Sequence, residues 1–147
     1  MTEDIALYKK MGIELFNYTW ELLDKPQRTR EDNDTMIHAA HASRFHWGKA
    51  GTAVNLARGE WQIARVYAVL GRAEAARFHG QRCLELCQEN EIGDFDLAFA
   101  YEALARAASV EGNAAEKAKY LALAQEATQH IADQADRDVV VHDLETI

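Results

Sequence analysis

Apolar and small residues recur every three or four positions through most of this chain, which is the spacing of one face of an α-helix. The first stripe predicts a helix over about residues 4–23 and contains Ile5, Tyr8, Gly12, Leu15, Thr19 and Leu22. Pro26 follows this stripe. Because the residue before a proline is disfavoured in helical backbone angles, we expect the first helix to end there.

A second helix is expected after a polar loop, with Asp32 or Asn33 as its N-cap. It should run to about residue 47, where Gly48 and Gly51 end it. The large apolar side chains expected in its core are Met36, Ile37, Phe45 and Trp47.

The same spacing predicts five further helices, over about residues 52–70, 73–89, 95–111, 114–131 and 136–147. Gly71 and Gly112 suit the left-handed position that ends many helices. Asn113, with Glu116 three residues later, is a typical start for the helix over 114–131. Because glycine inside a helix is unfavourable, Gly80 indicates that another helix approaches closely there.

Two of these helices carry well-defined inner faces. The helix over 73–89 is expected to bury Ala76, Gly80, Cys83, Leu84 and Cys87. The helix over 114–131 is expected to bury Ala114, Ala118, Leu121, Ala124 and Ile131.

These elements predict an all-α fold in a single domain. Three antiparallel helix hairpins, over 1–50, 52–90 and 95–132, are expected to stack on one another. The helix over 136–147 is expected to cap the stack, because the outer face of a terminal hairpin would otherwise expose apolar surface.

The stretch 57–87 is repeated, with variation, at 98–128. Ala57 opens the first copy and Ala98 the second, and Gly71 and Gly112 follow them at the same distance. Repetition at this scale is typical of stacked helical hairpins.

Both copies resemble the tetratricopeptide repeat, a 34-residue helix–turn–helix unit. In the first copy the matching residues are Ile63, Ala64, Tyr67, Gly71, Ala76 and Cys83. In the second copy they are Tyr101, Leu104, Ala105, Ala108, Gly112, Tyr120, Leu121 and Ala124. The chain departs from the pattern at Glu60, where an aromatic residue is usual, and at Lys117, where an alanine is usual.

In this family the first helix of each hairpin lines a concave groove. Carried over to this chain, the resemblance implies groove positions at Arg58, Trp61, Gln62, Arg65, Phe99, Glu102, Arg106 and Ser109. Arg65 and Arg106 occupy equivalent positions, so stacking would bring two guanidinium groups together. They need acidic partners, which are either internal, such as Glu60 and Glu102, or part of a ligand.

His38, His41 and His46 lie on one broad face of the second expected helix and form the one candidate for a metal site. The alternative is that they bond acidic neighbours, and this alternative is favoured. The motifs of common hydrolases and phosphate-binding loops are missing, so we expect no catalytic residue, metal or other cofactor. Trp20, Trp47 and Trp61 are expected in the core rather than at a stacking site.

Composition narrows the function further. The chain has 147 residues, 48% hydrophobic and 27% charged, which is typical of a soluble globular domain. A net charge of −8 argues against nucleic acid as a partner, and no apolar run is long enough for a membrane span. The acidic N-terminus lacks a signal-peptide pattern, so a cytoplasmic location is expected. Cys83 and Cys87 share a helix face and are expected to be buried thiols.

The expected function is a non-catalytic protein-interaction module that binds a peptide or a partner helix in the groove, with an acidic partner suggested by the arginines. Two alternatives remain open. One is a metal-dependent or small-molecule enzyme built on a helical bundle around the histidines. The other is a self-associating scaffold, such as a homodimer, that buries the N-terminal end of the stack.

Overall fold

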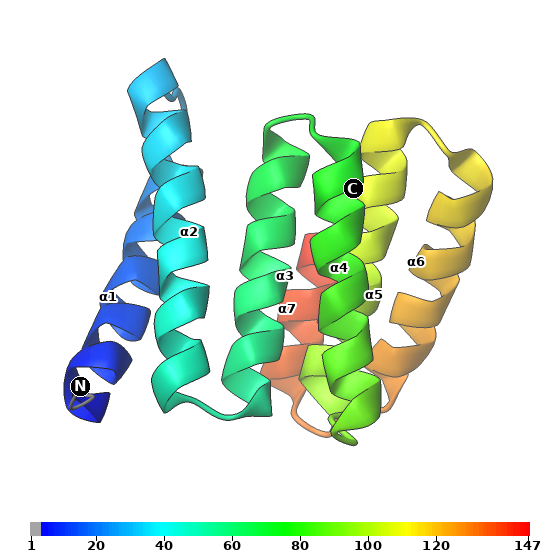
Figure 1. Cartoon of the computed structure of the whole chain (residues 1–147). Helices are drawn as coiled ribbons and strands as arrows, with labels where there is room; N and C mark the ends of the chain where they lie inside the picture. Colours follow the sequence, from blue (N-terminus) through cyan, green and yellow to red (C-terminus); the bar gives the residue numbers. More distant parts are fainter. Residues whose placement is uncertain (1–3) are drawn as a thin grey trace.

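The computed structural model describes residues 4–147 and folds them into seven α-helices without a strand (Figure 1). The helices are α1 (Ile5–Leu23), α2 (Arg30–Ala50), α3 (Ala53–Val69), α4 (Ala73–Glu89), α5 (Asp94–Glu111), α6 (Ala114–Gln129) and α7 (Gln134–Leu144). The all-α fold expected from the sequence is therefore confirmed for the described residues. None of these helices is both long enough and apolar enough to cross a membrane.

Consecutive helices pair into hairpins. α1 packs on α2, α3 on α4 and α5 on α6, with a short connection inside each pair. Contacts of α2 with α3 and of α4 with α5 join neighbouring hairpins, and α3 also contacts α5 directly. Figure 1 shows the three hairpins in a row, with α7 behind α3 and α4.

Helix α2 is longer than expected at both ends. It begins at Arg30 because Thr29 and Asp32 cap its first turn reciprocally. The Thr29 hydroxyl accepts a hydrogen bond from the Asp32 backbone N–H (3.1 Å), and the Asp32 carboxylate accepts one from the Thr29 N–H (3.0 Å). The prediction of an N-cap at Asp32 or Asn33 was therefore wrong. At the other end the helix continues through Gly48 and stops at Gly51.

The two glycines of the repeat end their helices as expected. Gly71 has a φ of 75° and Gly112 a φ of 81°, both in the left-handed region. Asn113 then caps α6, since its side-chain oxygen accepts a hydrogen bond from the Glu116 N–H at 3.1 Å.

The inner face predicted for α4 is confirmed, and all five of its residues are buried. Gly80 lies where α4 and α5 approach closely. A Cβ atom at this position would lie 3.3 Å from Leu104 Cδ2 and 3.5 Å from Ala103 Cβ. The absence of a side chain at Gly80 is what lets the two helices pack at this distance.

Four residues assigned to inner faces are exposed instead: Ile5, Phe45, Ala114 and Ala118. Ile5 lies in the first turn of α1, which packs mainly on α2. Phe45 is 61% exposed because its side of α2 is not covered by another described helix. Among the described helices α6 packs only on α5 and α7, so it buries just a narrow stripe at Ala124 and Thr128.

The first hairpin is held together at Gly12, where side chains of α2 pack on the α1 backbone. A Cβ atom at Gly12 would lie 2.9 Å from the Trp47 ring, so α1 needs a glycine there. The Ser43 hydroxyl of α2 donates a hydrogen bond to the Gly12 carbonyl at 2.8 Å. This packing fixes the side of α1 that is turned toward α3.

Helix α7 packs on α5 and α6. Its N-cap is Asp133, and its fully buried residue is Val140, which packs with Ile131 against Ala98 and Phe99. In this position α7 forms a wall beside the first helices of the hairpins.

Candidate functional site

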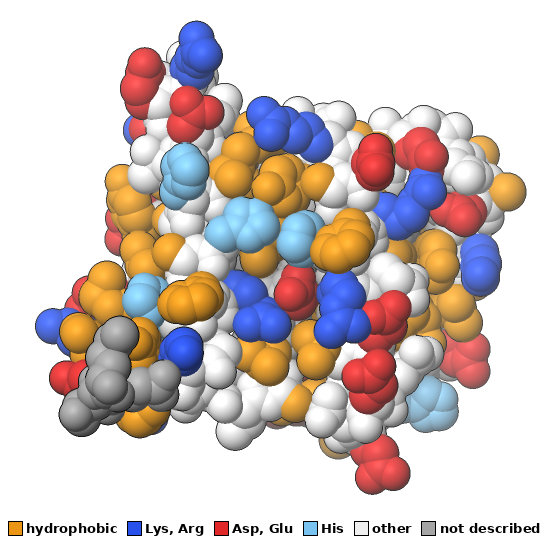
Figure 2. Space-filling view, viewed as in Figure 1, with side chains coloured by type: hydrophobic (Ala, Val, Ile, Leu, Met, Phe, Trp, Pro, Cys, Tyr) orange, Lys and Arg blue, Asp and Glu red, His pale blue; other side chains and the backbone are white. Residues whose placement is uncertain are grey.

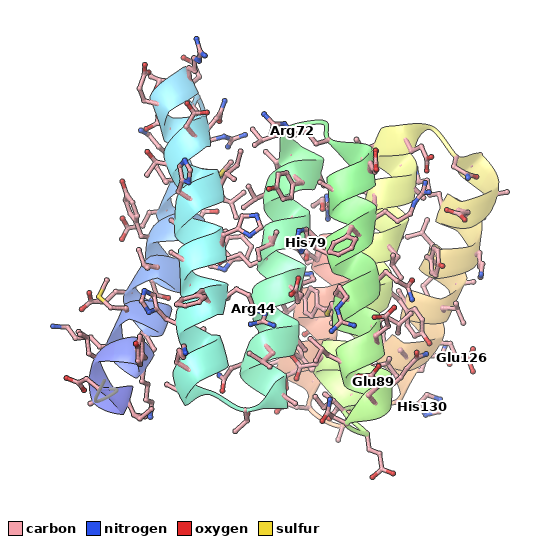
Figure 3. The ribbon with its side chains drawn as sticks, in the orientation of Figure 1. Arg44, Arg72, His79, Glu89, Glu126 and His130 are labelled. Atoms are coloured by element: carbon pink, nitrogen blue, oxygen red, sulfur yellow. The ribbon has the colours of Figure 1, made fainter. Side chains whose placement is uncertain are left out.

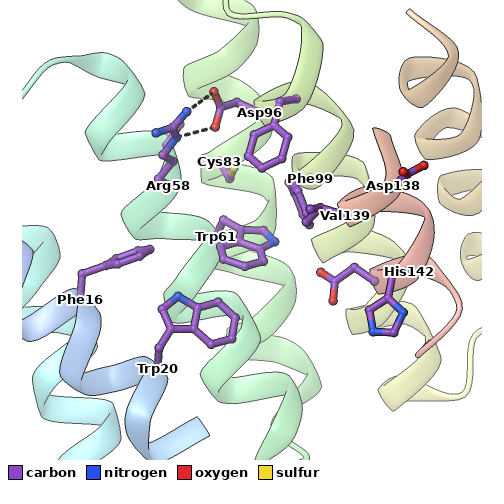
Figure 4. Close-up of a pocket in the computed structure, with 13 residues that line it drawn as sticks. Phe16, Trp20, Arg58, Trp61, Cys83, Asp96, Phe99, Asp138, Val139 and His142 are labelled. Atoms are coloured by element: carbon purple, nitrogen blue, oxygen red, sulfur yellow. Dashed lines mark hydrogen bonds and ion pairs between the residues drawn. The ribbon is translucent and has the colours of Figure 1, made fainter. Parts of the chain in front are cut away.

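Residues of five helices line an open cavity of about 640 Å³ (Figure 4). Five aromatic side chains line it: Phe16 and Trp20 from α1, Trp61 from α3, and Phe95 and Phe99 from α5. Val139 of α7 also lines it and lies beside Phe99 in Figure 4. A second cavity of about 180 Å³ shares Phe16 and Arg58 with the first and extends it toward Ile13 and Trp47. We call this combined surface the aromatic groove.

Four of the five rings of the aromatic groove contact one another in series. The ring centroids of Trp20 and Trp61 are 5.5 Å apart, those of Trp61 and Phe99 are 5.1 Å apart, and those of Phe95 and Phe99 are 4.8 Å apart. The last two pairs meet edge to face, a preferred arrangement of aromatic side chains. The groove therefore has a continuous apolar floor that is held in place by ring packing.

Arg58 and Asp96 form a two-point ion pair at one end of the groove. Arg58 Nε lies 2.8 Å from Asp96 Oδ1, and Arg58 Nη2 lies 3.2 Å from Asp96 Oδ2. The hydrogen bond to Asp96 raises the pKa of Arg58 above its ordinary value. The guanidinium is therefore positioned by an internal carboxylate.

Beneath the floor, the carboxylate of Glu102 is completely buried, with an exposed fraction of 0%. It accepts hydrogen bonds from Trp61 Nε1 (2.8 Å), Arg65 Nη2 (3.0 Å) and Arg106 Nε (2.7 Å). Arg65 also lies over the Trp61 ring, 5.3 Å from its centroid. These contacts fix the orientation of the Trp61 indole in the groove.

Helix α7 completes this arrangement from the far end of the chain. Asp143 Oδ2 lies 2.5 Å from Arg65 Nη2, and the Asp143 backbone carbonyl accepts a hydrogen bond from Arg106 Nη2 at 3.1 Å. We call Glu102, Arg65, Arg106, Asp143 and Trp61 the Glu102 network. It balances two cations with two carboxylates and ties α3, α5 and α7 together.

The residues expected in the groove separate into two groups. Arg58, Trp61 and Phe99 line the cavity, whereas Arg65, Glu102 and Arg106 lie beneath it in the Glu102 network. The sequence left open whether Arg65 and Arg106 pair with carboxylates of the chain or of a ligand. In the structure both pair with Glu102. Gln62 is fully buried and donates a hydrogen bond to the Phe16 carbonyl at 2.9 Å, so it does not line an open surface.

Sequence reasoning missed the walls of the groove. Trp20 was expected in the core, and no role was assigned to Phe16, Phe95 or Val139. The one available signal was the spacing of Phe16 and Trp20, which places both on one side of α1, along the edge of its predicted inner stripe. Nothing in the sequence indicated that Val139 would also line the groove.

The three candidate histidines do not come together. His38 is exposed, His41 Nε2 shares a hydrogen bond of 2.8 Å with the Tyr67 hydroxyl, and the His46 ring packs on Tyr8. Within residues 4–147 there is no group of three or more histidine, cysteine or acidic side chains that could hold a metal ion.

One of these histidines belongs to a different polar cluster, between α2, α3 and α4. Glu60 Oε2 lies 2.7 Å from His79 Nδ1, and Glu60 Oε1 lies 3.2 Å from Arg44 Nε. The His79 ring stacks on Tyr67 and meets His41 edge to face. Figure 3 shows Arg44 and His79 on the two helices that flank α3, and Figure 2 shows histidine side chains gathered on this face. We call these five residues the histidine cluster.

The surroundings change the acidity of two members of the histidine cluster. Burial lowers the pKa of His41 below its ordinary value, and the nearby His79 lowers it further. Burial alone would raise the pKa of Glu60, but the hydrogen bond and charge of His79, together with Arg44, outweigh it and lower that pKa. The cluster is therefore arranged around an ionised Glu60 and a neutral His41.

Cys83 and Cys87 are buried and form no disulfide, as expected for packed thiols. Cys83 lies at the base of the groove. Its hydrogen bond with Cys87, together with burial, raises the pKa of the Cys83 thiol. Its environment therefore favours the uncharged thiol.

Comparisons of this chain with protein-family models, with curated proteins and with solved structures find no match. The assignment of a function therefore depends on the geometry of the site.

Proposed function

We propose that this chain is a non-catalytic binding module that holds an apolar segment of a partner protein, as a peptide or a helix, in the aromatic groove. The observation that carries the proposal is the set of five aromatic rings around an open cavity of about 640 Å³. Ligand sites in proteins are typically concave, have volumes of ~300–1,000 Å³ and are lined mainly by apolar and aromatic side chains. Phe99 is buried and the other four rings are partly buried, so an apolar occupant would remove their remaining accessible surface from water.

We also propose that the hairpins form a tetratricopeptide-like array. Two observations support this arrangement: Gly71 and Gly112 end α3 and α5 in the same backbone conformation, and the equivalent Arg65 and Arg106 both bond Glu102. The groove is lined by α1, α3, α5 and α7, with Cys83 as the contribution of α4. In such arrays the concave side is the binding surface.

Binding is favoured over chemistry because the arginines at the groove and beneath it are held by carboxylates of the chain itself. Arg58 is paired with Asp96, and Asp143 is paired with Arg65. The expectation of an acidic partner depended on unpaired arginines, and each of these arginines has a carboxylate partner inside the chain. We therefore propose that apolar contact, rather than positive charge, supplies most of the affinity.

Two valines of α7 provide a matched test. Val139 lines the groove and is 51% exposed, whereas Val141 is 46% exposed and faces a separate surface between α6 and α7. Peptides would be selected from a displayed random library on the wild-type protein, and their dissociation constants measured on Val139→Asn and Val141→Asn. Burying an amide without a partner costs ~1–3 kcal/mol. Val139→Asn should therefore weaken binding about tenfold, while Val141→Asn leaves it unchanged.

Two results would contradict the proposal. One is a selection that enriches no peptide on the wild-type protein. The other is equal binding of the selected peptides to both valine variants, which would place their site outside the groove. Both variants should melt at the wild-type temperature, since each valine is about half exposed.

A further inference from the structure

The charges around the aromatic groove do not cancel. Arg58 is neutralised by Asp96, and the Glu102 network is balanced within itself. Asp136 and Asp138 on α7 have no basic partner among residues 4–147. The α7 wall therefore carries two carboxylates outside these ion pairs, while the nearby Arg137 bonds the neutral Gln134 and His142 also lines the cavity.

Both carboxylates lie on the α7 wall. Asp138 is one of the residues that line the cavity (Figure 4). Asp136 is three residues before Val139, so it lies on nearly the same side of the helix as that groove residue. Asp96 is the main cause of the raised pKa of Arg58, and the charge of Asp136 adds to it. Both aspartates are solvent-exposed, so an incoming chain can reach them.

We propose that the partner segment is an amphipathic helix whose apolar side packs on the aromatic floor and whose lysine or arginine side chains lie along α7, beside Asp136 and Asp138. This inference rests on the proposed function of the groove and names the chemistry of its occupant. The net charge of −8 on the whole chain favours the approach of the same kind of partner. Charge complementarity of this type sets partner choice and association rate more than total affinity.

The test uses the tightest helical peptide from the library selection, synthesised in two versions. The versions share all apolar positions and carry either lysine or glutamate at the polar ones. Binding would be measured by fluorescence anisotropy at low and high salt. Exposed ion pairs are individually weak, so two of them should give the lysine version an advantage of about three- to tenfold, which falls in high salt.

A matched pair of charge variants identifies the carboxylates responsible. Asp136→Asn with Asp138→Asn should reduce the lysine advantage to less than about twofold. Glu89→Gln with Glu126→Gln makes the same change in net charge at two exposed positions away from the groove (Figure 3) and should leave the advantage unchanged.

The outcomes separate the two proposals. Equal binding of the lysine and glutamate versions would overturn the proposal of a basic partner. An equal loss of the lysine advantage in both double variants would do the same. Either result would leave the groove as the binding site. Binding of both versions that is unaffected by Val139→Asn would overturn the groove itself, and the basic partner with it.

Discussion

Glu102 shows how a single buried residue organises the candidate site. It has no contact with solvent, yet it accepts hydrogen bonds from Trp61, Arg65 and Arg106. A buried carboxylate is stable only when it is paired and hydrogen-bonded, and here three donors satisfy it. Because Glu102 accepts the hydrogen bond of the Trp61 indole, the orientation of this groove ring depends on the Glu102 network.

Glu102→Gln should therefore destabilise the protein. Removing the negative charge leaves Arg65 and Arg106 with Asp143 as their remaining carboxylate, and loss of one partner in such a network costs ~2–4 kcal/mol. Chemical denaturation measures the change. Glu116→Gln, at the partly exposed start of α6, is the control and should cost far less. Equal stability of Glu102→Gln and the wild type would mean that the network does not hold the floor.

The sequence was informative about which residue types stand at the groove but not about their pairing. Arg65 and Arg106 could be placed at equivalent positions because the repeat relates them. Asp143 could not be found as their partner, because it lies in the last helix and reaches Arg65 only through the packing of α7 on the third hairpin. Contacts between distant segments depend on tertiary packing, which local periodicity does not encode.

At the scale of whole helices, the histidine cluster joins α2 to α3 and α4. His41 bonds Tyr67, and Glu60 bonds both Arg44 and His79. The α1–α2 hairpin supplies Phe16 and Trp20 to the groove, so the docking of α2 on α3 also sets the position of one groove wall. The histidine cluster therefore helps to fix the position of this groove wall, although it lies between α2, α3 and α4 and not in the groove.

The cluster should make stability depend on pH in a defined direction. Because the pKa of His41 in the folded chain lies below its ordinary value of 6.5, the unfolded chain binds the proton more readily. The contribution of His41 to the free energy of unfolding is thus complete above pH about 6.5 and is lost as the pH falls below that value. Melting temperatures measured between pH 7.5 and 5.5 test this.

The matched comparison uses two glutamine variants. His41→Gln should lower the pH dependence of the melting temperature over this range. His130→Gln changes an exposed histidine at the end of α6 and should leave the dependence as it is in the wild type. An unchanged slope in His41→Gln would show that this histidine does not titrate with folding.

Helix boundaries were predictable where a local signal exists. Gly71, Gly112 and Asn113 act at the positions that the sequence indicated. The start of α2 was misplaced because Asp32 can serve either as an N-cap or as the third residue of a capping box, and Thr29 decides between the two. The exposure of Ala114 and Ala118 in α6 was not predictable, because it results from tertiary packing in which only α5 and α7 contact this helix.

At the scale of the whole molecule, helical periodicity predicts the succession of hairpins. It does not predict the groove. Its α3 and α5 residues Trp61 and Phe99 were expected through the repeat. Phe16 and Trp20 could not be predicted as groove residues, because the first hairpin shows no repeat signature. Val139 could not be predicted as a groove residue either, because the position of the last helix depends on the surface that the other six helices leave open.

The five phenylalanines of the chain allow the central claim to be tested in one experiment. Phe16, Phe95 and Phe99 line the groove, whereas Phe45 and Phe78, each 61% exposed, lie away from it on α2 and α4. With 4-fluorophenylalanine at all five positions, ¹⁹F NMR gives one signal per ring, assigned by single substitutions. On addition of a selected peptide we predict shifts for the three groove rings and none for Phe45 and Phe78. Shifts confined to Phe45 or Phe78 would contradict the groove as the binding surface.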